Sequence, residues 1–124
     1  MNNILYKICN DKRKFVELQR KKTPEKELQI VIDNIESPRG FKKKIDKNFK
    51  TGKISVIAEI KQASPSKGII CKNFNPVEIA KKYTTGNATC ISVLTDTKYF
   101  LGNSDDLIQV KKNSIAPILR KDFI

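Results

Sequence analysis

The chain has 124 residues, 39% of them hydrophobic, which is enough for a small core and excludes a disordered composition. Its 25 lysines and arginines outnumber 13 acidic residues, and the net charge of +12 favours a nucleic acid, a membrane surface or an anionic small molecule as partner. Three cysteines without close ligand spacing, no histidine, no long apolar run and no signal-like N-terminus predict a reduced, cytoplasmic protein without a metal.

Two amphipathic helices are expected at the N-terminal end. Apolar residues recur at helical intervals from Asn2 to Lys22 and define one side of a first helix. Thr23 and Pro24 form a start signal for a second helix, with the threonine as N-cap and the proline at the first helical position. The apolar stripe of this second helix consists of Leu28, Val31, Ile32 and Ile35.

Most of the positive charge lies in the same region, since residues 1–53 hold 15 of the 25 basic side chains. The basic runs stand in helical or linker contexts, without the interleaved aromatic residues or the reading motif that is typical of nucleic-acid-binding proteins. We interpret them as solvated faces. A genome rich in lysine, asparagine and isoleucine codons would explain the excess without any partner.

A different pattern follows residue 53. The segment Ile54–Ile60 is β-branched and almost continuously apolar, which is typical of a strand covered on both faces. Asn75, Pro76 and Glu78 then combine an N-cap, a proline at the first helical position and an acid in the first turn. A helix is therefore expected to begin there and to end before Gly86.

Three further segments continue the alternation of strands and helices. Ala88–Leu94 is a second buried strand, Ser104–Asp106 caps a second helix, and Ile115–Ile118 begins a third strand. Because parallel neighbours need crossover connections, this order predicts a parallel α/β sheet built of βαβ units. The order alone fits an open doubly wound sheet and a closed barrel equally well.

Charged residues stand at the ends of two predicted strands: Glu59 and Lys61 at the end of the first, and Lys121 at the end of the third. Glu59 and Lys61 are two residues apart, so their side chains are expected to share one face of the strand. Such a pair has a structural interpretation as well as a catalytic one. The turn that follows has neither the glycine pattern of a dinucleotide-binding fold nor that of a P-loop.

Several motifs in this half of the chain are similar to those of one enzyme family. They are Ala58–Lys61 with Ser64–Gly68, Ile91–Asp96, Lys98–Gly102 and Leu119–Ile124. In this order they resemble the strand-end signatures of indole-3-glycerol-phosphate synthases. The resemblance implies the N-terminal part of a TIM (β/α)8 barrel, with residues 1–50 as a helical extension and linker and residues 51–124 as the first three strands and two helices.

The resemblance also implies a carbon-carbon lyase of tryptophan biosynthesis that needs no cofactor. Its substrate, 1-(2-carboxyphenylamino)-1-deoxyribulose 5-phosphate, carries a carboxylate and a phosphate and undergoes ring closure, decarboxylation and dehydration. By this likeness Lys121 is the general acid of ring closure, Lys61 holds the departing carboxylate, and Glu59 orients Lys61 and stabilises positive charge on the ring nitrogen. The division of proton transfers between the two lysines stays open.

Three other residues are expected to contact the substrate. Ser64 resembles a contact on the loop after the first strand, and Leu94 with Phe100 resembles the apolar wall beside the anthranilate ring. Each of the three has an ordinary packing role as its alternative.

The resemblance also implies that the chain holds only part of the barrel and of its active site. A (β/α)8 barrel needs about 250 residues, and the family's general-base glutamate, a later asparagine and the phosphate-binding loops would follow Ile124. We therefore expect a fragment with an incomplete barrel that is inactive alone. The alternatives are an inactive remnant of the enzyme and, with least support, a small basic nucleic-acid-binding protein. The sequence leaves open whether a phosphoribosylanthranilate isomerase is fused to it or separate.

Overall fold

The computed structural model describes residues 3–124 of the chain. Contacts between residues divide it into two compact units. The first holds the residues up to Ser37 together with Phe123 and Ile124, and the second runs from Pro38 to Asp122. The segment 41–50, which the sequence groups with the N-terminal extension, therefore lies in the same unit as the sheet.

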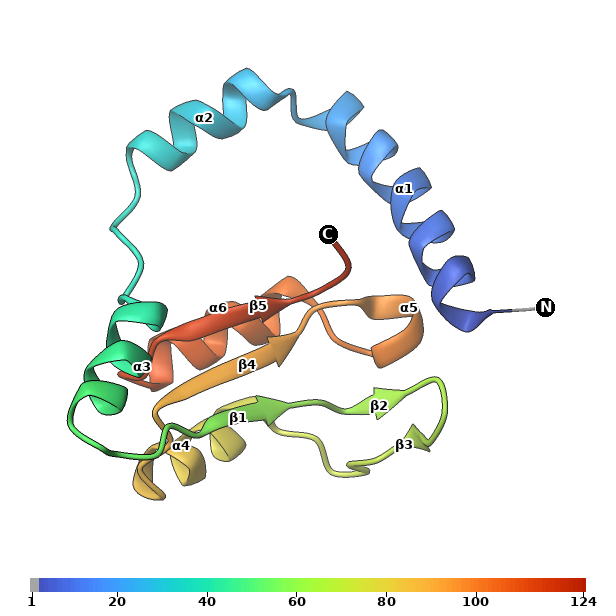
Figure 1. The fold of residues 1–124 in the computed structure, drawn as a ribbon. Helices are drawn as coiled ribbons and strands as arrows, with labels where there is room; N and C mark the ends of the chain where they lie inside the picture. Colours follow the sequence, from blue (N-terminus) through green and yellow to red (C-terminus); the bar gives the residue numbers. More distant parts are fainter. Residues whose placement is uncertain (1–2) are drawn as a thin grey trace. The chain divides into compact units, whose positions relative to one another are not determined.

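Two helices make up most of the first unit (Figure 1). Helix α1 spans Ile4–Lys22, and the side chain of Asn3 caps it by accepting a hydrogen bond of 3.0 Å from the backbone N–H of Leu5. The predicted helix agrees with α1, except that Asn2 lies outside the described residues. Helix α2 spans Glu25–Asp33. The predicted stripe is exposed at Leu28, Val31, Ile32 and Ile35, and its last member, Ile35, lies beyond the end of the helix.

The predicted start of α2 is wrong by one residue. Pro24 occupies the N-cap position, with an extended ψ of 151°, and it does not occupy the first helical position. Thr23, which the sequence suggested as the cap, instead ends α1, where its N–H donates to the carbonyl of Gln19 at 2.8 Å. The two helices follow each other so closely that the last turn of α1 takes up this threonine.

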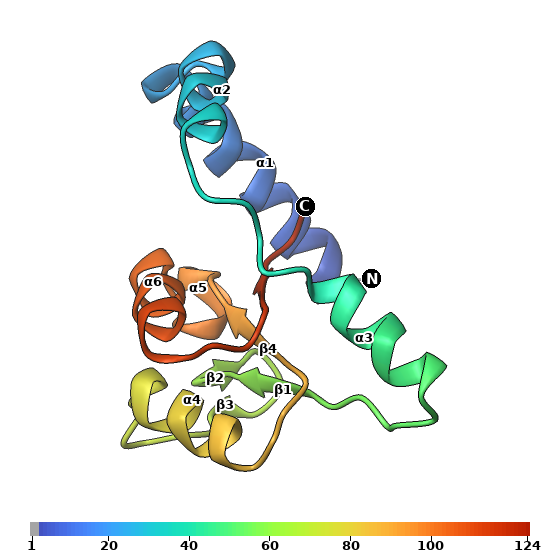
Figure 2. The ribbon, with the colours of Figure 1, turned by 90° about the vertical axis from the view of Figure 1, so that its left-hand side faces the viewer.

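The second unit is built around a parallel sheet of three strands. These are β1 (Ile57–Ile60), β4 (Cys90–Leu94) and β5 (Ile118–Lys121), in the spatial order β1-β4-β5. Helices α4 (Pro76–Thr85) and α6 (Ser104–Asn113) follow β1 and β4 and cover one face of the sheet (Figures 1 and 2). The structure thus confirms the predicted parallel α/β arrangement of βαβ units.

The hydrophobic core lies between this face of the sheet and the two helices. Every second strand residue points toward α4 and α6, as the alternation of a strand requires. Six buried residues form the core: Ile60, Ala80, Ile91, Val93, Val110 and Ala116. The helices therefore fix the opposite strand residues, including Glu59 and Lys121, on the other face of the sheet.

The first strand is less covered than its sequence indicates. β1 is confined to residues 57–60, and Ile54, Val56 and Ile57 are 90%, 53% and 48% exposed. Coverage on both faces was a wrong prediction for this strand, because α4 packs on one face only and β1 forms an edge of the sheet.

The caps of the two helices were predicted with different success. Asn75 caps α4 as expected, and its side chain accepts hydrogen bonds from the N–H groups of Val77 and Glu78 at 3.1 Å. The cap of α6 is Asn103, whose side chain accepts from Asp106 N at 2.8 Å. The predicted cap Ser104 is wrong by one residue, because it is already the first residue of the helix.

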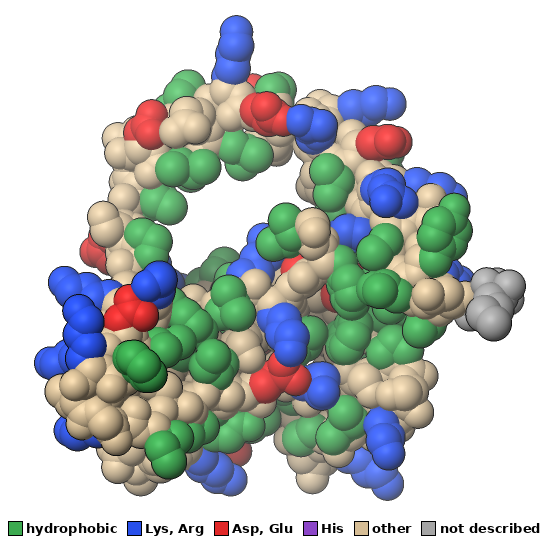
Figure 3. Space-filling view, viewed as in Figure 1, with side chains coloured by type: hydrophobic (Ala, Val, Ile, Leu, Met, Phe, Trp, Pro, Cys, Tyr) green, Lys and Arg blue, Asp and Glu red, His purple; other side chains and the backbone are tan. Residues whose placement is uncertain are grey.

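Helix α3 (Phe41–Lys50) lies at the amino-terminal ends of β1 and β4 (Figure 1). The side-chain amide of Asn48 donates to Ser55 Oγ at 3.1 Å and to Thr89 Oγ1 at 3.3 Å, which ties the helix to the residues that precede both strands. Lysine side chains gather over this helix on the surface (Figure 3). The exposed ones are Lys42, Lys43, Lys44, Lys47 and Lys50.

Two short elements follow the carboxyl ends of the first two strands. After β1 the chain forms an antiparallel hairpin of β2 (Ala63–Ser64) and β3 (Gly68–Ile69), and after β4 it forms the short helix α5 (Thr97–Phe100). Helix α5 contacts β2. The loops that leave neighbouring strands therefore meet above the carboxyl edge of the sheet.

Within residues 3–124 none of the helices is long and apolar enough to cross a membrane. In the same range, histidine, cysteine, aspartate and glutamate do not form groups of three or more that are suited to hold a metal ion.

Candidate active site

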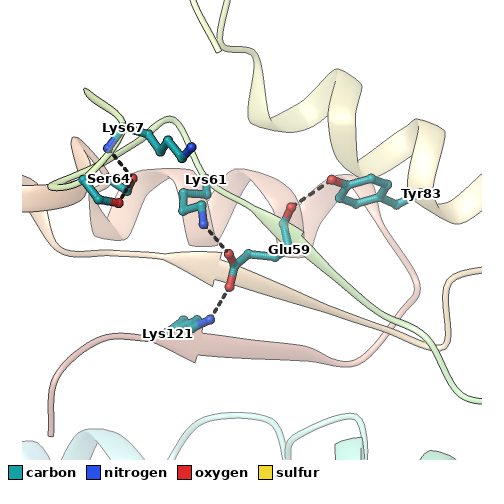
Figure 4. Close-up of polar contacts among 7 residues, drawn as sticks. Glu59, Lys61, Ser64, Lys67, Tyr83 and Lys121 are labelled. Carbon is teal, nitrogen blue, oxygen red and sulfur yellow. Dashed lines mark hydrogen bonds and ion pairs between the residues drawn. The ribbon is translucent and has the colours of Figure 1, made fainter. Parts of the chain in front are cut away.

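Three charged side chains meet at the carboxyl ends of β1 and β5 (Figure 4). Glu59 lies between the other two, with its Oε1 atom 3.2 Å from the Nζ atom of Lys61. Its Oε2 atom accepts a hydrogen bond from the ammonium group of Lys121. The structure therefore brings together the three residues that the sequence suggested as catalytic.

The register of the sheet explains why they meet although 62 positions separate Glu59 from Lys121. Glu59 pairs with Ser92 across β1 and β4, and Leu94 pairs with Lys121 across β4 and β5. Because side chains alternate between the two faces of a strand, all of these point to the face that α4 and α6 leave uncovered. Leu94 lies 5% exposed beside the charged group.

The surroundings of Glu59 favour its charged form. Burial raises the pKa of the Glu59 carboxyl, but the hydrogen bonds and charges of Lys121 and Lys61 together outweigh burial and hold this pKa below its ordinary value. The side chains are 27% exposed for Glu59, 34% for Lys61 and 51% for Lys121. An incoming anion can therefore reach both ammonium groups from solvent.

A tyrosine that the sequence analysis missed supports the same strand. The hydroxyl of Tyr83, on α4, donates a hydrogen bond of 2.8 Å to the main-chain carbonyl of Glu59 (Figure 4). In the sequence Tyr83 is only one more member of the apolar side of a helix. Its contact with a catalytic candidate becomes visible only when α4 is packed on β1.

Ser64 has a structural role in the hairpin after β1. Its Oγ atom accepts a hydrogen bond of 3.3 Å from the N–H of Lys67 and lies 3.5 Å from Ser66 Oγ (Figure 4). The turn continues through Gly68, whose φ of +64° favours glycine. The serine therefore stabilises the loop that carries it.

The predicted apolar wall consists of Leu94, which ends β4, and Phe100, which lies in the segment that follows β4. Phe100 ends α5 and is half-buried, and α5 contacts β2, which carries Ser64. Gly102 closes this loop: its N–H donates to the carbonyl of Asp96 at 2.9 Å, and a Cβ atom on it would lie 2.2 Å from the carbonyl oxygen of Leu94. The backbone of the loop thus packs directly on the end of β4.

A parallel sheet of βαβ units with an acid and two lysines at its carboxyl edge places the chain among α/β proteins whose sites form at the carboxyl ends of the strands. A family model described as indole-3-glycerol phosphate synthase matches residues 5–124.

Relatives named indole-3-glycerol phosphate synthase lead to the same family. The proteins from Zymomonas mobilis subsp. pomaceae, Bordetella pertussis and Rhizorhabdus wittichii are 46%, 44% and 43% identical to the chain over all 124 residues. The chain belongs to the indole-3-glycerol phosphate synthase family. It spans about half the length of these relatives, 47% in each case, and its sheet fits the N-terminal part of a TIM barrel.

Proposed function

We propose that this chain supplies the first catalytic residues of an indole-3-glycerol phosphate synthase. The reaction closes the pyrrole ring of 1-(2-carboxyphenylamino)-1-deoxyribulose 5-phosphate and releases carbon dioxide and water. The observation that carries this function is the ion-paired group of Glu59, Lys61 and Lys121 at the carboxyl edge of the sheet. Family membership and the match of the whole chain to enzymes of that name support it.

In ring closure, the aromatic carbon that bears the carboxylate attacks the ribulose carbonyl carbon, and the carbonyl oxygen needs a proton. Lys121 is the general acid that donates it: the family resemblance gives it this role, and its side chain, 51% exposed beside Glu59, is open to an incoming substrate. The new carbon-carbon bond leaves positive charge on the ring nitrogen. Glu59, charged and held between the lysines, stabilises that charge.

The later steps involve the second lysine. Lys61 holds the carboxylate as it departs as carbon dioxide, and the electron pair of the broken bond restores the aromatic ring. The hydroxyl group formed in ring closure is then protonated by Lys61 and leaves as water. The adjacent ring carbon loses a proton to the general-base glutamate that the family resemblance implies, and this completes the double bond of the pyrrole ring. The Nζ atom of Lys61 lies 3.2 Å from Glu59 Oε1, so Glu59 orients the ammonium group for both tasks.

The remaining contacts complete the binding side of the proposal. Ser64 contacts the substrate from the hairpin, and Leu94 with Phe100 forms the wall for its aromatic ring. Helix α5, which carries Phe100, contacts β2, which carries Ser64, so the two binding residues lie in neighbouring loops. The partner is therefore a small anion with a carboxylate and a phosphate, and no cofactor takes part. The described cysteines are all free, which suits a cytoplasmic location.

The direct test is product formation by the polypeptide as its source cell makes it. Its intact mass is compared with the 14.1 kDa of this chain, and indole-3-glycerol phosphate is then followed by its indole fluorescence. We expect turnover that falls at least ~1,000-fold in Lys121→Met, as expected for loss of a general acid and its charge.

Lys82→Met serves as the matched control, because Lys82 is an exposed lysine of α4 away from the charged group. Its turnover should equal that of the wild type. If the wild-type polypeptide forms no product while folded, the remnant interpretation replaces the enzyme. If Lys121→Met turns over normally, the general acid is another group.

A further inference from the structure

A single threonine is hydrogen-bonded to three consecutive residues around Lys121. Thr95 directly follows β4 and is 5% exposed. Its N–H donates to the carbonyl of Lys121 at 3.0 Å, and its hydroxyl donates to Asp122 Oδ2 at 2.8 Å. The same hydroxyl oxygen accepts a hydrogen bond of 3.0 Å from the Nε atom of Arg120.

These contacts lie on the face of the sheet opposite to the charged group. Leu94 and Lys121 pair in register and point to the catalytic face, so Thr95, Arg120 and Asp122, one position away, point to the other face. The hydroxyl of Thr95 therefore binds both neighbours of Lys121 on the face covered by α4 and α6, while the ammonium group of Lys121 contacts Glu59 on the opposite face.

The two neighbours of Lys121 that contact the Thr95 hydroxyl, Arg120 and Asp122, differ in how exposed their side chains are. Asp122 has a side chain that is 8% exposed, and its Oδ2 atom is also 3.8 Å from the guanidinium of Arg120, which is 51% exposed. The threonine hydroxyl uses its donor for the aspartate and its acceptor for the arginine, so it connects two opposite charges. Loss of the hydroxyl alone would remove one hydrogen bond from each of these neighbours of Lys121.

We propose that Thr95 is a positioning residue for Lys121: its hydroxyl fixes the backbone at the end of β5, so that the lysine ammonium group is aimed at Glu59 and at the reacting carbonyl of the substrate. This inference rests on the proposed function for the role of Lys121. Position matters here because a displacement of ~1 Å at a reacting group can lower a rate by up to ~100-fold.

The test compares three variants of the polypeptide as its source cell makes it. Thr95→Val keeps the shape of the side chain and removes the hydroxyl, and Thr95→Ser keeps the hydroxyl. Thr84→Val is the matched control, because Thr84 is also a partly buried threonine whose hydroxyl donates to Ala80 O at 2.8 Å and lies 3.2 Å from Ser114 Oγ, away from the charged group.

Two quantities are measured for each variant: kcat and KM, and the pKa of the Glu59 carboxyl by carbon NMR, which does not depend on activity. In Thr95→Val we expect kcat to fall ~10-fold or more with little change in KM. We also expect the Glu59 pKa to rise, because Lys121 contacts the carboxylate less often. Thr95→Ser should restore both values, and Thr84→Val should leave both at the wild-type values.

An unchanged Glu59 pKa in Thr95→Val would overturn the positioning role even if no variant, including the wild type, forms product. A wild type that forms no product while Thr95→Val shifts this pKa would overturn the enzymatic function and keep the positioning role. Equal losses of kcat in Thr95→Val and Thr84→Val would assign the threonine to general stability and overturn the inference.

Discussion

The hydroxyl of Tyr83 is hydrogen-bonded to the main-chain carbonyl oxygen of Glu59 at 2.8 Å. This carbonyl points away from β4, because the carbonyl of Val56 accepts from Cys90 N and carbonyl directions alternate along a strand. Tyr83 thus satisfies a backbone acceptor at the edge of β1 that no strand of the described sheet reaches.

Removal of this hydroxyl should destabilise the sheet edge. For Tyr83→Phe we expect the free energy of unfolding to fall by about 1 kcal/mol, because one partly buried hydrogen bond is lost and the ring stays packed. Chemical denaturation of the full polypeptide measures the change. Tyr6→Phe, at a side chain that is 72% exposed, should change stability by less than about 0.5 kcal/mol. Equal stability of Tyr83→Phe and the wild type would contradict the assignment.

The paired lysines should set the pH range in which Glu59 is charged. Replacement of Lys121 by methionine removes a hydrogen bond and a positive charge and leaves the effect of burial, so the pKa of the Glu59 carboxyl should rise. Carbon NMR of the labelled carboxyl follows the titration directly. Lys112→Met removes an exposed charge on α6 and should leave the Glu59 titration in place.

The same shift has a consequence for stability. A carboxyl whose pKa is lower in the folded state than in the unfolded state stabilises the protein above its unfolded value, and this contribution is lost as the pH falls through the folded value. In Lys121→Met the folded pKa of Glu59 is higher, so less stability should be lost on acidification. A pH series of unfolding curves that shows a larger acid loss in the variant would contradict this sign.

Patterns along the chain were sufficient for the order of the second unit. The β-branched segment before Glu59 and the cap at Asn75 predicted β1 and α4, since both depend on local preference and periodicity. The meeting of Glu59, Lys61 and Lys121 also followed from strand-end positions in a parallel sheet, together with the resemblance to a known family. The strand and helix signals lie in residues close together along the chain, and the parallel order of the strands then brings Glu59 and Lys121 together across 62 positions.

What the sequence did not reveal depends on contacts across the fold. Tyr83 and Thr95 have ordinary helix and strand surroundings in the sequence, and their partners are set by packing and register. The helix caps Pro24 and Asn103 were missed by one residue, because neighbouring polar residues offered equivalent start signals. The conformation of the loop after β4 was not predicted for a third reason: it depends on how closely the backbone at Gly102 approaches the end of β4.

That close approach predicts the behaviour of Gly102. In Gly102→Ala the added Cβ atom would lie 2.2 Å from the carbonyl oxygen of Leu94 and 2.8 Å from its carbonyl carbon, so the loop must move. We expect a loss of about 2 kcal/mol or more in unfolding free energy, and a higher KM because Phe100 is displaced. Gly86→Ala, with 3.4 Å to its nearest backbone atom, is the control and should be nearly neutral. Stability equal to that of the control would show that the loop adapts without strain.

Arg39 is exposed to solvent, yet it should stabilise the second unit far more than an ordinary surface residue does. Its guanidinium donates to the carbonyls of Lys111 at 2.9 Å, Ala116 at 3.3 Å and Ser114, which lie at and beyond the carboxyl end of α6, where helix carbonyls lack partners in the next turn. A positive charge there also interacts favourably with the helix dipole.

For Arg39→Ala we therefore expect a loss of about 2 kcal/mol in unfolding free energy, because charged hydrogen bonds to three carbonyls are removed together. Arg39→Lys should recover only part of it, since an ammonium group lacks the planar fork that reaches several acceptors at once. Arg20→Ala is the matched control: its ion pair with Glu25 has both side chains about two-thirds exposed, at 65% and 69%. Its loss should stay below about 1 kcal/mol. Equal losses for Arg39→Ala and Arg20→Ala in urea denaturation would reduce Arg39 to an ordinary surface residue.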